Sequence, residues 1–310
     1  MTGRRAGSGA VLLAIGETMA MVAPIAAVPV EEAETFRVDA GGAESNVAAH
    51  AAALGVTAVW YSRLGDDALG RRVASRVAAR SVDVSRVDTD PRHPTGLYVK
   101  NPGHGVTYYR AGSAASHLSR ADADALVLDG IDIVHLSGIT AALSVSAAAF
   151  LARVIDRARG AGVMVSFDVN HRAALWPAEA AAAPLLTLAR RADIVFVGRD
   201  EAETLWGAAT ADAARALLPA VRQLVVKDGA VGATVFEAGA AVFEPALVVD
   251  VVEPVGAGDA FAGGYLAALL AGEPPAARLR LGHDRAALTM ATTGDFPDPT
   301  QTRSSERTPA

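Results

Sequence analysis

The chain has 310 residues, of which 51% are hydrophobic, and this length and composition are those of a globular protein of one or two domains, not of a disordered chain. The formal net charge of −6 at pH 7 excludes the broad basic surface with which proteins bind nucleic acid, so a small molecule is the expected partner. The chain contains no cysteine, which excludes disulfides, thiolate nucleophiles and cysteine-based zinc sites and fits the reducing cytoplasm.

The first apolar segment follows Arg4 and Arg5, as in a secretory signal peptide. Its run AVLLAI is interrupted by Gly16, Glu17 and Thr18, whereas a signal peptide stays apolar for about 7 to 15 residues. We therefore expect a buried first strand. No stretch reaches the roughly 18 consecutive apolar residues of a membrane span, so we also expect a soluble protein without a membrane partner.

Helix-like, alanine-rich stretches alternate with short apolar runs over most of the chain. AESNVAAHAAALG precedes AVWYSRLG, AAAFLARVIDRARGAG precedes VMVSFDVN, and further apolar runs are DIVHLSG, DIVFVG and QLVVKDG. Runs that are apolar along their whole length are typical of parallel strands covered by helices on both faces. The sequence therefore predicts one α/β domain over residues 10–294 with a central, mostly parallel sheet, flanked by disordered tails at residues 1–9 and 295–310.

Two segments interrupt this alternation, at about residues 18–40 and 94–112. The second contains TGLYVKNPGHGVTYYR, in which β-forming residues flank a turn of Gly, Pro and Asn. We expect hairpin strands outside the main sheet, joined from these two separate stretches into one small β-lid.

A glycine-bracketed turn precedes a helical stretch in EPVGAGDAFAGG, residues 253–264. Successive backbone N–H groups of Gly256, Ala257 and Gly258 at a helix start form an anion site suited to a phosphoryl group. Asp259 beside that site has the chemistry to accept the proton of an attacking hydroxyl. The same letters fit an ordinary turn in which Asp259 caps the helix, and the motif alone leaves both interpretations open.

Two other phosphate-binding motifs are absent. A P-loop needs a lysine after its second glycine, and neither of the chain's lysines, Lys100 and Lys227, stands in such a sequence. A dinucleotide-binding fingerprint needs a glycine at the position that Phe261 occupies after Gly258.

Two longer signatures occur in one order, GGAESNVAAHAAALG near the start and VEPVGAGDAFAGGYLAALL near the end. With them the chain resembles the ribokinase-like (PfkB) sugar kinases from about Leu12 to Gly294, and most closely the kinases of 2-keto-3-deoxygluconate. The resemblance implies a ribokinase-like three-layer sandwich with a central mostly parallel sheet and a small β-lid. It also implies ATP and Mg²⁺ as cofactors of a carbohydrate phosphotransferase, with a bound monovalent cation left open.

The resemblance assigns roles to residues in both signatures. It makes Asp259 the catalytic base and the turn of Gly256, Ala257 and Gly258 the anion hole. It places the sugar hydroxyls at Gly41, Gly42, Asn46 and Ile139. Glycine permits close approach there and the Asn46 amide both donates and accepts hydrogen bonds, although a tight turn before the next helix explains GGAESN as well. The nucleotide is expected at Lys227, Gly229, Gly232 and His283.

Three residues depart from the family pattern. In GRDEAETLWG, Gly198 stands where an asparagine helps to organise magnesium and phosphate, while Glu201 remains, so Glu201 is expected to act on the metal indirectly. Glu253 replaces a common aspartate, which bears on the monovalent cation. His283 replaces an asparagine near the adenine.

Three stretches, TGLYVK, VTYYRAGSAAS and DVNHRAALW, are similar to those of kinases for an acidic sugar. A substrate carboxylate is best held by the planar fork of an arginine, and the candidates are Arg110 and Arg172, with hydroxyl donors from Tyr98 and Tyr108. Arg110 is the more diagnostic, because fructokinases carry a similar pattern around Arg172, whose role in phosphate binding or in the fold stays open. Asp168 is expected to orient its loop.

The sequence therefore predicts a cytoplasmic, ATP-dependent kinase that phosphorylates the primary hydroxyl of 2-keto-3-deoxygluconate or a close sugar acid. A fructokinase or another PfkB sugar kinase is the first alternative, and a sugar-binding regulator without turnover is the second. Relatives often pair their lids, so a homo-oligomer formed through the lid is expected.

Overall fold

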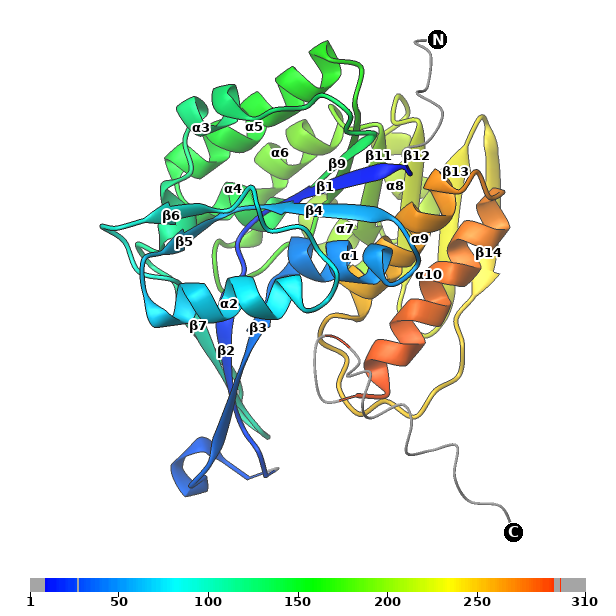
Figure 1. Ribbon diagram of the computed structural model, residues 1–310. Helices are drawn as coiled ribbons and strands as arrows, with labels where there is room; N and C mark the ends of the chain where they lie inside the picture. Colours follow the sequence, from blue (N-terminus) through cyan, green and yellow to red (C-terminus); the bar gives the residue numbers. More distant parts are fainter. Residues whose placement is uncertain (1–8, 27, 293–295, 297–310) are drawn as a thin grey trace.

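An eight-stranded sheet lies at the centre of the protein, whose computed structural model describes residues 9–26, 28–292 and 296 (Figure 1). The predicted tails, residues 1–9 and 295–310, lie outside the described residues apart from Gly9 and Phe296. The strand order is β14-β13-β12-β11-β10-β9-β1-β4, and pairing is parallel from β12 to β4, whereas β13 and β14 add an antiparallel edge. The strands are β1 (Val11–Ile15), β4 (Thr57–Tyr61), β9 (Ile133–Ser137), β10 (Met164–Asp168), β11 (Ile194–Gly198), β12 (Gln223–Asp228), β13 (Gly232–Glu237) and β14 (Ala240–Pro245).

Helices cover both faces of this sheet. The first face is covered by α3 (Arg120–Ala125), α4 (Gly138–Leu143), α5 (Val145–Gly160), α6 (Ala178–Ala189), α7 (Arg199–Trp206) and α8 (Ala211–Leu217). The second is covered by α1 (Ala43–Ala52), α2 (Ala68–Ala78), α9 (Ala257–Leu270) and α10 (Pro275–Met290). Along β1, Leu13 and Ile15 pack into the first layer and Leu12 and Ala14 into the second, because side chains alternate along a strand. The predicted α/β class with a central, mostly parallel sheet is confirmed.

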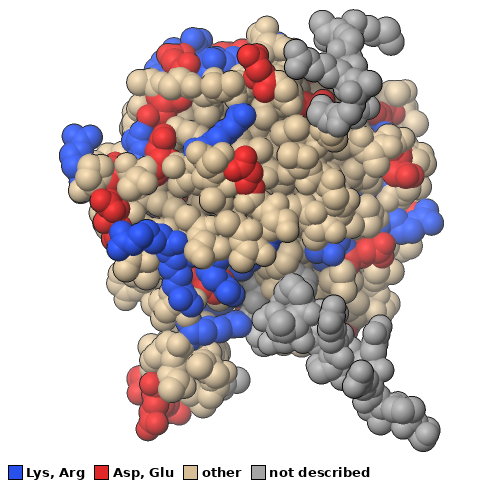
Figure 2. All heavy atoms as spheres, viewed as in Figure 1, with Lys and Arg blue, Asp and Glu red and all other residues tan. Residues whose placement is uncertain are grey.

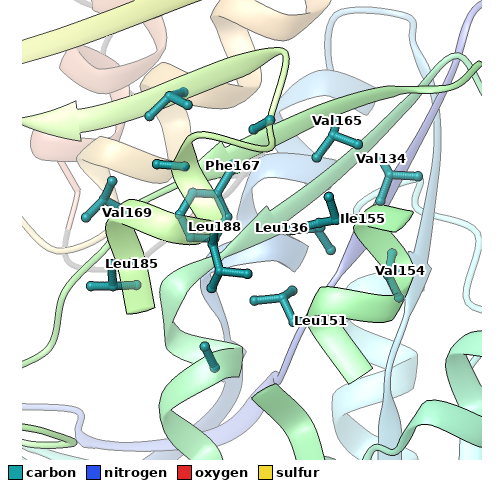
Figure 3. Packing of buried hydrophobic residues seen from close by; sticks show 14 of the residues in the cluster. Val134, Leu136, Leu151, Val154, Ile155, Val165, Phe167, Val169, Leu185 and Leu188 are labelled. Carbon is teal, nitrogen blue, oxygen red and sulfur yellow. The ribbon is translucent and has the colours of Figure 1, made fainter. Parts of the chain in front are cut away.

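The larger core lies on the first face. Figure 3 shows Leu136 of β9 and Val165 and Phe167 of β10 close to Leu151 and Ile155 of α5, all of them fully buried. Burial of such a side chain contributes about 1.5 to 3 kcal/mol relative to its exposure, so this face anchors the strands whose ends carry the site.

A separate four-stranded sheet, called here the small sheet, protrudes from the main body (Figure 1). Its order is β3-β2-β7-β8, with β2 antiparallel to β3 and parallel to β7, and β7 antiparallel to β8. Its strands, β2 (Met19–Pro24), β3 (Phe36–Gly41), β7 (Leu97–Asn101) and β8 (Gly105–Tyr109), come from the two segments expected outside the main sheet. The limits of the predicted domain, residues 10–294, and the function of this sheet as a lid stay predictions.

The remaining elements are short: β5 (Arg63–Gly65) pairs with β6 (Asp88–Asp90), and the 3-10 helices are η1 (Val30–Glu32) and η2 (Ala114–His117). Figure 2 shows charges of both signs on the face it displays, with acidic side chains at the tip of the small sheet, where Glu31 and Glu32 of η1 are exposed. Within the part of the chain that the structure describes, no helix combines the length and the apolarity needed to cross a bilayer.

Candidate active site

A cleft of ≈ 860 Å³ lies between the main body and the small sheet. Its walls are the start of α1, the segments that follow β1, β9 and β10, the turn before α9, and strands of the small sheet. The carboxyl ends of parallel strands are where α/β folds bind ligands. The cleft brings together the predicted site residues Gly41, Gly42, Asn46, Tyr98, Tyr108, Arg110, Ile139, Arg172, Gly256 and Asp259.

Asp259 lies in the first turn of α9 and lines this cleft, although only 8% of its surface is exposed. Its Oδ2 accepts a hydrogen bond from Asn46 Nδ2 at 3.0 Å. Burial raises the pKa of Asp259 to about 7, while the Asn46 hydrogen bond and the positive charge of Arg172 act in the opposite direction. A carboxylate with this pKa takes up and releases a proton near neutral pH, which suits a general base.

The turn before α9 leaves backbone donors at the helix start. Gly256 has a φ of 85°, a left-handed conformation that glycine adopts without strain, and no side chain caps the helix. The N–H of Ala257 donates to the carbonyl of Pro254 at 3.3 Å, so this one of the three predicted donors already has a partner within the turn. A Cβ on Gly258 would lie 3.5 Å from Lys227 Nζ, which brings a positive charge to the positive end of the helix dipole.

Lys227 pairs with the buried Asp168, since its Nζ donates to Asp168 Oδ2 at 2.8 Å. Burial acts to lower the pKa of Lys227, but the negative charges of Asp168 and Glu201 outweigh it and raise that pKa. Asp168 Oδ1 is buried and has no hydrogen-bond partner within the described residues. An orphaned carboxylate oxygen of this kind suits a bound cation or a water molecule attached to one.

Glu201 fastens two segments of the site together. Its Oε1 accepts the N–H of His171 at 2.7 Å and its Oε2 accepts the N–H of Gly198 at 2.7 Å. Burial and the nearby charge of Asp168 raise the pKa of Glu201. Among the described residues no group of three or more acidic or histidine side chains is arranged to hold a metal ion. The indirect role of Glu201 on the metal therefore stays a prediction.

Arg110 is held by Glu17, a residue of the cleft that sequence reasoning did not assign. Arg110 Nε donates to Glu17 Oε2 at 2.7 Å, Arg110 Nη2 contacts the same oxygen, and Ser113 Oγ donates to Oε1. Glu17 is 3% exposed, and a Cβ on Gly96 would lie 2.9 Å from its Oε1. The sequence did contain a signal for Glu17, since this charged residue interrupts the first apolar run. A charge directly after a buried parallel strand lies at the carboxyl end of the sheet, where ligands bind in α/β folds.

The two tyrosines face each other across β7 and β8. Tyr98 is paired in register with Tyr108, and their ring centroids are 5.8 Å apart. The guanidinium of Arg110 lies 5.8 Å from the centre of the Tyr108 ring. Arg172 is exposed and also lines the cleft, but it comes from the segment that follows β10 and not from the small sheet.

The predicted nucleotide residues do not line this cleft, although Lys227 reaches the turn before α9. Gly229 (φ 49°) lies in the connection from β12 to β13, and Gly232 (φ 149°) is the first residue of β13. A Cβ on Gly232 would meet the Glu244 carbonyl at 2.4 Å, so only glycine fits there. His283 Nε2 lies 3.1 Å from the same carbonyl, and its role beside adenine stays a prediction.

Glu44, within GGAESN, was also not assigned by sequence reasoning. Its Oε1 accepts Ser137 Oγ at 2.6 Å, whereas its Oε2 is buried without a partner in the described structure. Burial raises the pKa of Glu44 to about 7. A Cβ on Gly16 would lie 2.0 Å from its carboxyl carbon, so Glu44 packs between β1 and β9 and supports the start of α1.

Comparison with known proteins adds independent findings. Residues 10–302 match the family described as pfkB family carbohydrate kinase. The 2-dehydro-3-deoxygluconokinase of Thermoproteus tenax is 37% identical over 296 residues, which cover 92% of this chain and 89% of that relative. Fructokinase-1 of Oryza sativa subsp. japonica is 32% identical over 270 residues, which cover 84% of this chain and 83% of that relative. The crystal structure of a PfkB protein from Polaromonas sp. JS666 superposes with a TM-score of 0.85 at 33% identity, covering 96% of this chain and 99% of that one.

Proposed function

The chain belongs to the PfkB family of carbohydrate kinases, and from this membership we propose that it transfers the γ-phosphoryl group of ATP to the primary hydroxyl of 2-keto-3-deoxygluconate or a close sugar acid. The observation that carries the proposal is that one cleft contains both the buried carboxylate of Asp259 and the guanidinium of Arg110. The carboxylate suits deprotonation of an alcohol, and the guanidinium suits recognition of an acid group. The T. tenax relative, whose name refers to the same sugar acid, supports this choice of substrate.

We assign Asp259 as the general base. It accepts the proton of the primary hydroxyl as that oxygen attacks phosphorus, which makes the oxygen a better nucleophile. Asn46 holds Oδ2 at 3.0 Å, and this hydrogen bond orients the carboxylate so that Oδ1 remains for the hydroxyl.

The phosphoryl group is assigned to the turn of Gly256, Ala257 and Gly258. The helix start and the ammonium of Lys227 both favour negative charge there. Mg²⁺ bound to the nucleotide phosphates supplies further charge neutralisation when it is present. Asp168 and Glu201 are the carboxylates that would hold it, acting through water. Gly229, Gly232 and His283 are assigned to the remainder of the nucleotide.

Arg110 is assigned to the acid group of the substrate. Glu17 accepts from Nε and Nη2, on one edge of the guanidinium, and Nη1 with the second Nη2 hydrogen forms another edge. A carboxylate bound at that second edge receives two parallel hydrogen bonds, and the hydroxyls of Tyr98 and Tyr108 add donors beside it. Closure of the small sheet over the sugar would exclude water from the reacting phosphate.

A fructokinase is the second candidate. The contact between Glu17 and Arg110 favours it, because the charge of Arg110 already has a counter-ion before any acid binds. The identity with the rice fructokinase favours it as well. Both candidates use Asp259 and the glycine turn in the same way, so they differ only in the sugar.

The experiment that tests the proposal is a coupled assay of ADP release by the purified protein with ATP and Mg²⁺. The sugars are 2-keto-3-deoxygluconate, fructose, glucose and ribose, each varied in concentration to obtain kcat/KM. We expect the sugar acid to have the highest kcat/KM. A higher value for fructose selects the second candidate, and ADP release at background with every sugar contradicts both.

A further inference from the structure

Glu17 is an acidic residue of the cleft to which the proposed function gives no role of its own. It lies between β1, which ends at Ile15, and β2, which begins at Met19, so it stands where the main body joins the small sheet. It lines the cleft, yet its side chain is only 1% exposed. A carboxylate buried to this extent needs partners, because an unpaired buried charge is strongly destabilising.

Both oxygens of this carboxylate are bound by one short segment that follows β8. Oε2 accepts from Arg110 Nε at 2.7 Å and also contacts Nη2, and Oε1 accepts from Ser113 Oγ. Ser113 is buried, and its N–H donates to the Arg110 carbonyl at 3.0 Å. The segment from Arg110 to Ser113 is therefore a closed turn, which Glu17 connects to the end of β1.

Gly96 leaves the space in which the carboxylate of Glu17 lies. A Cβ on Gly96 would be 2.9 Å from Glu17 Oε1 and 3.0 Å from Met19 Cγ, closer than such atoms normally approach. The φ of Gly96 is not positive, so space and not backbone conformation accounts for a glycine here. Packing as well as hydrogen bonding thus determines where Glu17 lies.

These contacts determine the orientation of Arg110. Oε2 of Glu17 occupies the side edge of the guanidinium, formed by Nε and Nη2. The end edge, formed by Nη1 and the outer hydrogen of Nη2, then has a fixed direction, and two parallel hydrogen bonds to a carboxylate depend on that direction. A guanidinium on a freely rotating side chain would have to be ordered on binding, which lowers affinity.

The charge of Glu17 balances that of Arg110. Net charge therefore contributes little to the attraction of an acid at this point of the cleft. Recognition depends instead on the direction of the N–H donors, which suits a planar carboxylate better than a neutral hydroxyl.

We propose that Glu17 is a positioning residue that determines selectivity for the acid group, because it holds the guanidinium of Arg110 in the orientation that a substrate carboxylate requires. It acts through Arg110, by its shape and not by its charge. The inference rests on the proposed function in that Arg110 binds the acid group of the sugar.

Two variants of Glu17 separate position from charge. Glu17→Asp keeps the charge but shortens the side chain by one methylene group, so the carboxylate no longer reaches both Arg110 and Ser113. Glu17→Gln keeps the length and removes the charge, and it can retain both contacts, because its carbonyl oxygen accepts from Arg110 and the Ser113 hydroxyl accepts as well as donates.

The measured quantity is kcat/KM for 2-keto-3-deoxygluconate and for fructose, replaced by the calorimetric Kd of each sugar where fructose is not turned over. In Glu17→Asp, we expect kcat/KM for the acid to fall by about tenfold or more, mainly through KM, and that for fructose by less than about threefold. In Glu17→Gln, neither value should fall by more than about threefold.

Gly96→Ala is a second variant, which leaves every polar group in place. Its added methyl group displaces Oε1 of Glu17, although Gly96 does not line the cleft, so it should lower kcat/KM for the acid selectively as well. It carries the same test if Glu17→Asp does not fold. The matched control is Glu237→Asp, which shortens a carboxylate 2.8 Å from Arg278 and outside the cleft lining, and which should leave both sugars unchanged.

The double variant Glu17→Asp with Arg110→Lys tests whether Glu17 acts through Arg110. We expect kcat/KM for the acid to be no lower than in Arg110→Lys alone, because the fork that Glu17 positions is already lost. A further fall of about tenfold would give Glu17 a role independent of Arg110 and would overturn the inference.

The inference is also overturned if Glu17→Asp and Gly96→Ala keep the wild-type preference for the acid, or if both sugars fall equally, since Glu17 would then only support the fold. Loss of the preference in Glu17→Gln but not in Glu17→Asp would make charge decisive and overturn it too. A failure of the proposed function is distinguishable, because it appears in the wild type, as a preference for fructose or as ADP release at background. Either wild-type result overturns the proposed substrate and this inference together, whereas the variant results above overturn the inference alone.

Discussion

Asn46 Nδ2 donates a hydrogen bond to Asp259 Oδ2 at 3.0 Å, although the two residues are 213 positions apart in the sequence. The bond forms because α1 and α9 pack closely on the same face of the main sheet. Gly263 of α9 permits that approach, since a Cβ there would lie 2.6 Å from His50 Cβ and 2.7 Å from the Val47 carbonyl of α1. The contact joins the GGAESN segment, which is proposed to bind the sugar, to the proposed base.

The variant Asp259→Asn tests the proposed base. The amide keeps the size of the side chain and an oxygen that accepts from Asn46, but it does not take up the hydroxyl proton. We expect kcat to fall by about 10² to 10⁴, the usual contribution of a positioned general base, while the Kd for ATP stays close to that of the wild type. Steady-state kinetics and calorimetry measure the two quantities. If Asp259→Asn kept the kcat of the wild type, Asp259 would not be the base, and its role would be limited to capping the helix.

The pH dependence follows from the raised pKa of Asp259. Burial raises this pKa to about 7, and a base works only when it is deprotonated, so activity is lost as the pH falls through that value. We expect kcat/KM for the sugar to decrease by about tenfold for each pH unit below about 7, measured over the range from about 5 to 9. An unperturbed aspartate would keep the profile flat over this range.

Glu44 provides the control for this profile. Burial raises its pKa to about 7 as well, but it does not line the cleft. The variant Glu44→Gln should therefore keep the acid limb of kcat/KM, with an apparent pKa no higher than that of the wild type, because the negative charges of Glu44 and Asp259 repel each other. If the acid limb disappeared in Glu44→Gln, the titrating group would be Glu44, and the assignment to Asp259 would be wrong.

The variant Gly263→Ala tests the packing that positions Asn46 and Asp259. The added methyl group meets backbone and side-chain atoms of α1, so we expect a loss of unfolding free energy of about 1 to 3 kcal/mol, as for other overpacked sites. Because α1 and α9 would separate, kcat should fall too. Gly160→Ala is the control, since nothing lies within 4 Å of its new Cβ. Thermal unfolding should show Gly263→Ala below the wild type and Gly160→Ala at or above it.

The fold was accessible from the sequence because its strands are apolar along their whole length. VMVSFDVN and DIVFVG are buried on both sides, and that pattern indicates a covered parallel sheet. The antiparallel edge of β13 and β14 was not predicted, since β14 has exposed positions and its run resembles an ordinary loop.

The site was accessible only in part. The glycine turn and Asp259 are adjacent in the sequence, and their chemistry can be inferred locally. The partner of Arg110 cannot be inferred locally, because Glu17 lies 93 residues earlier and only the folded chain brings the two residues together. The closeness of Lys100 to Glu253 depends likewise on how the small sheet lies over the turn. Hydrophobic periodicity identifies the buried faces of elements, but it carries no information on which distant polar groups meet.

The central claim is that Arg110 recognises an acid group on the sugar. The most direct measurement is kcat/KM for 2-keto-3-deoxygluconate and for fructose, in the wild type and in Arg110→Lys under the same conditions. The wild type should prefer the acid. Arg110→Lys keeps the charge but loses the fork, so it should lower kcat/KM for the acid by about 10- to 100-fold and leave the value for fructose within about threefold. A wild type that prefers fructose, or an equal fall for both sugars in the variant, would contradict the account.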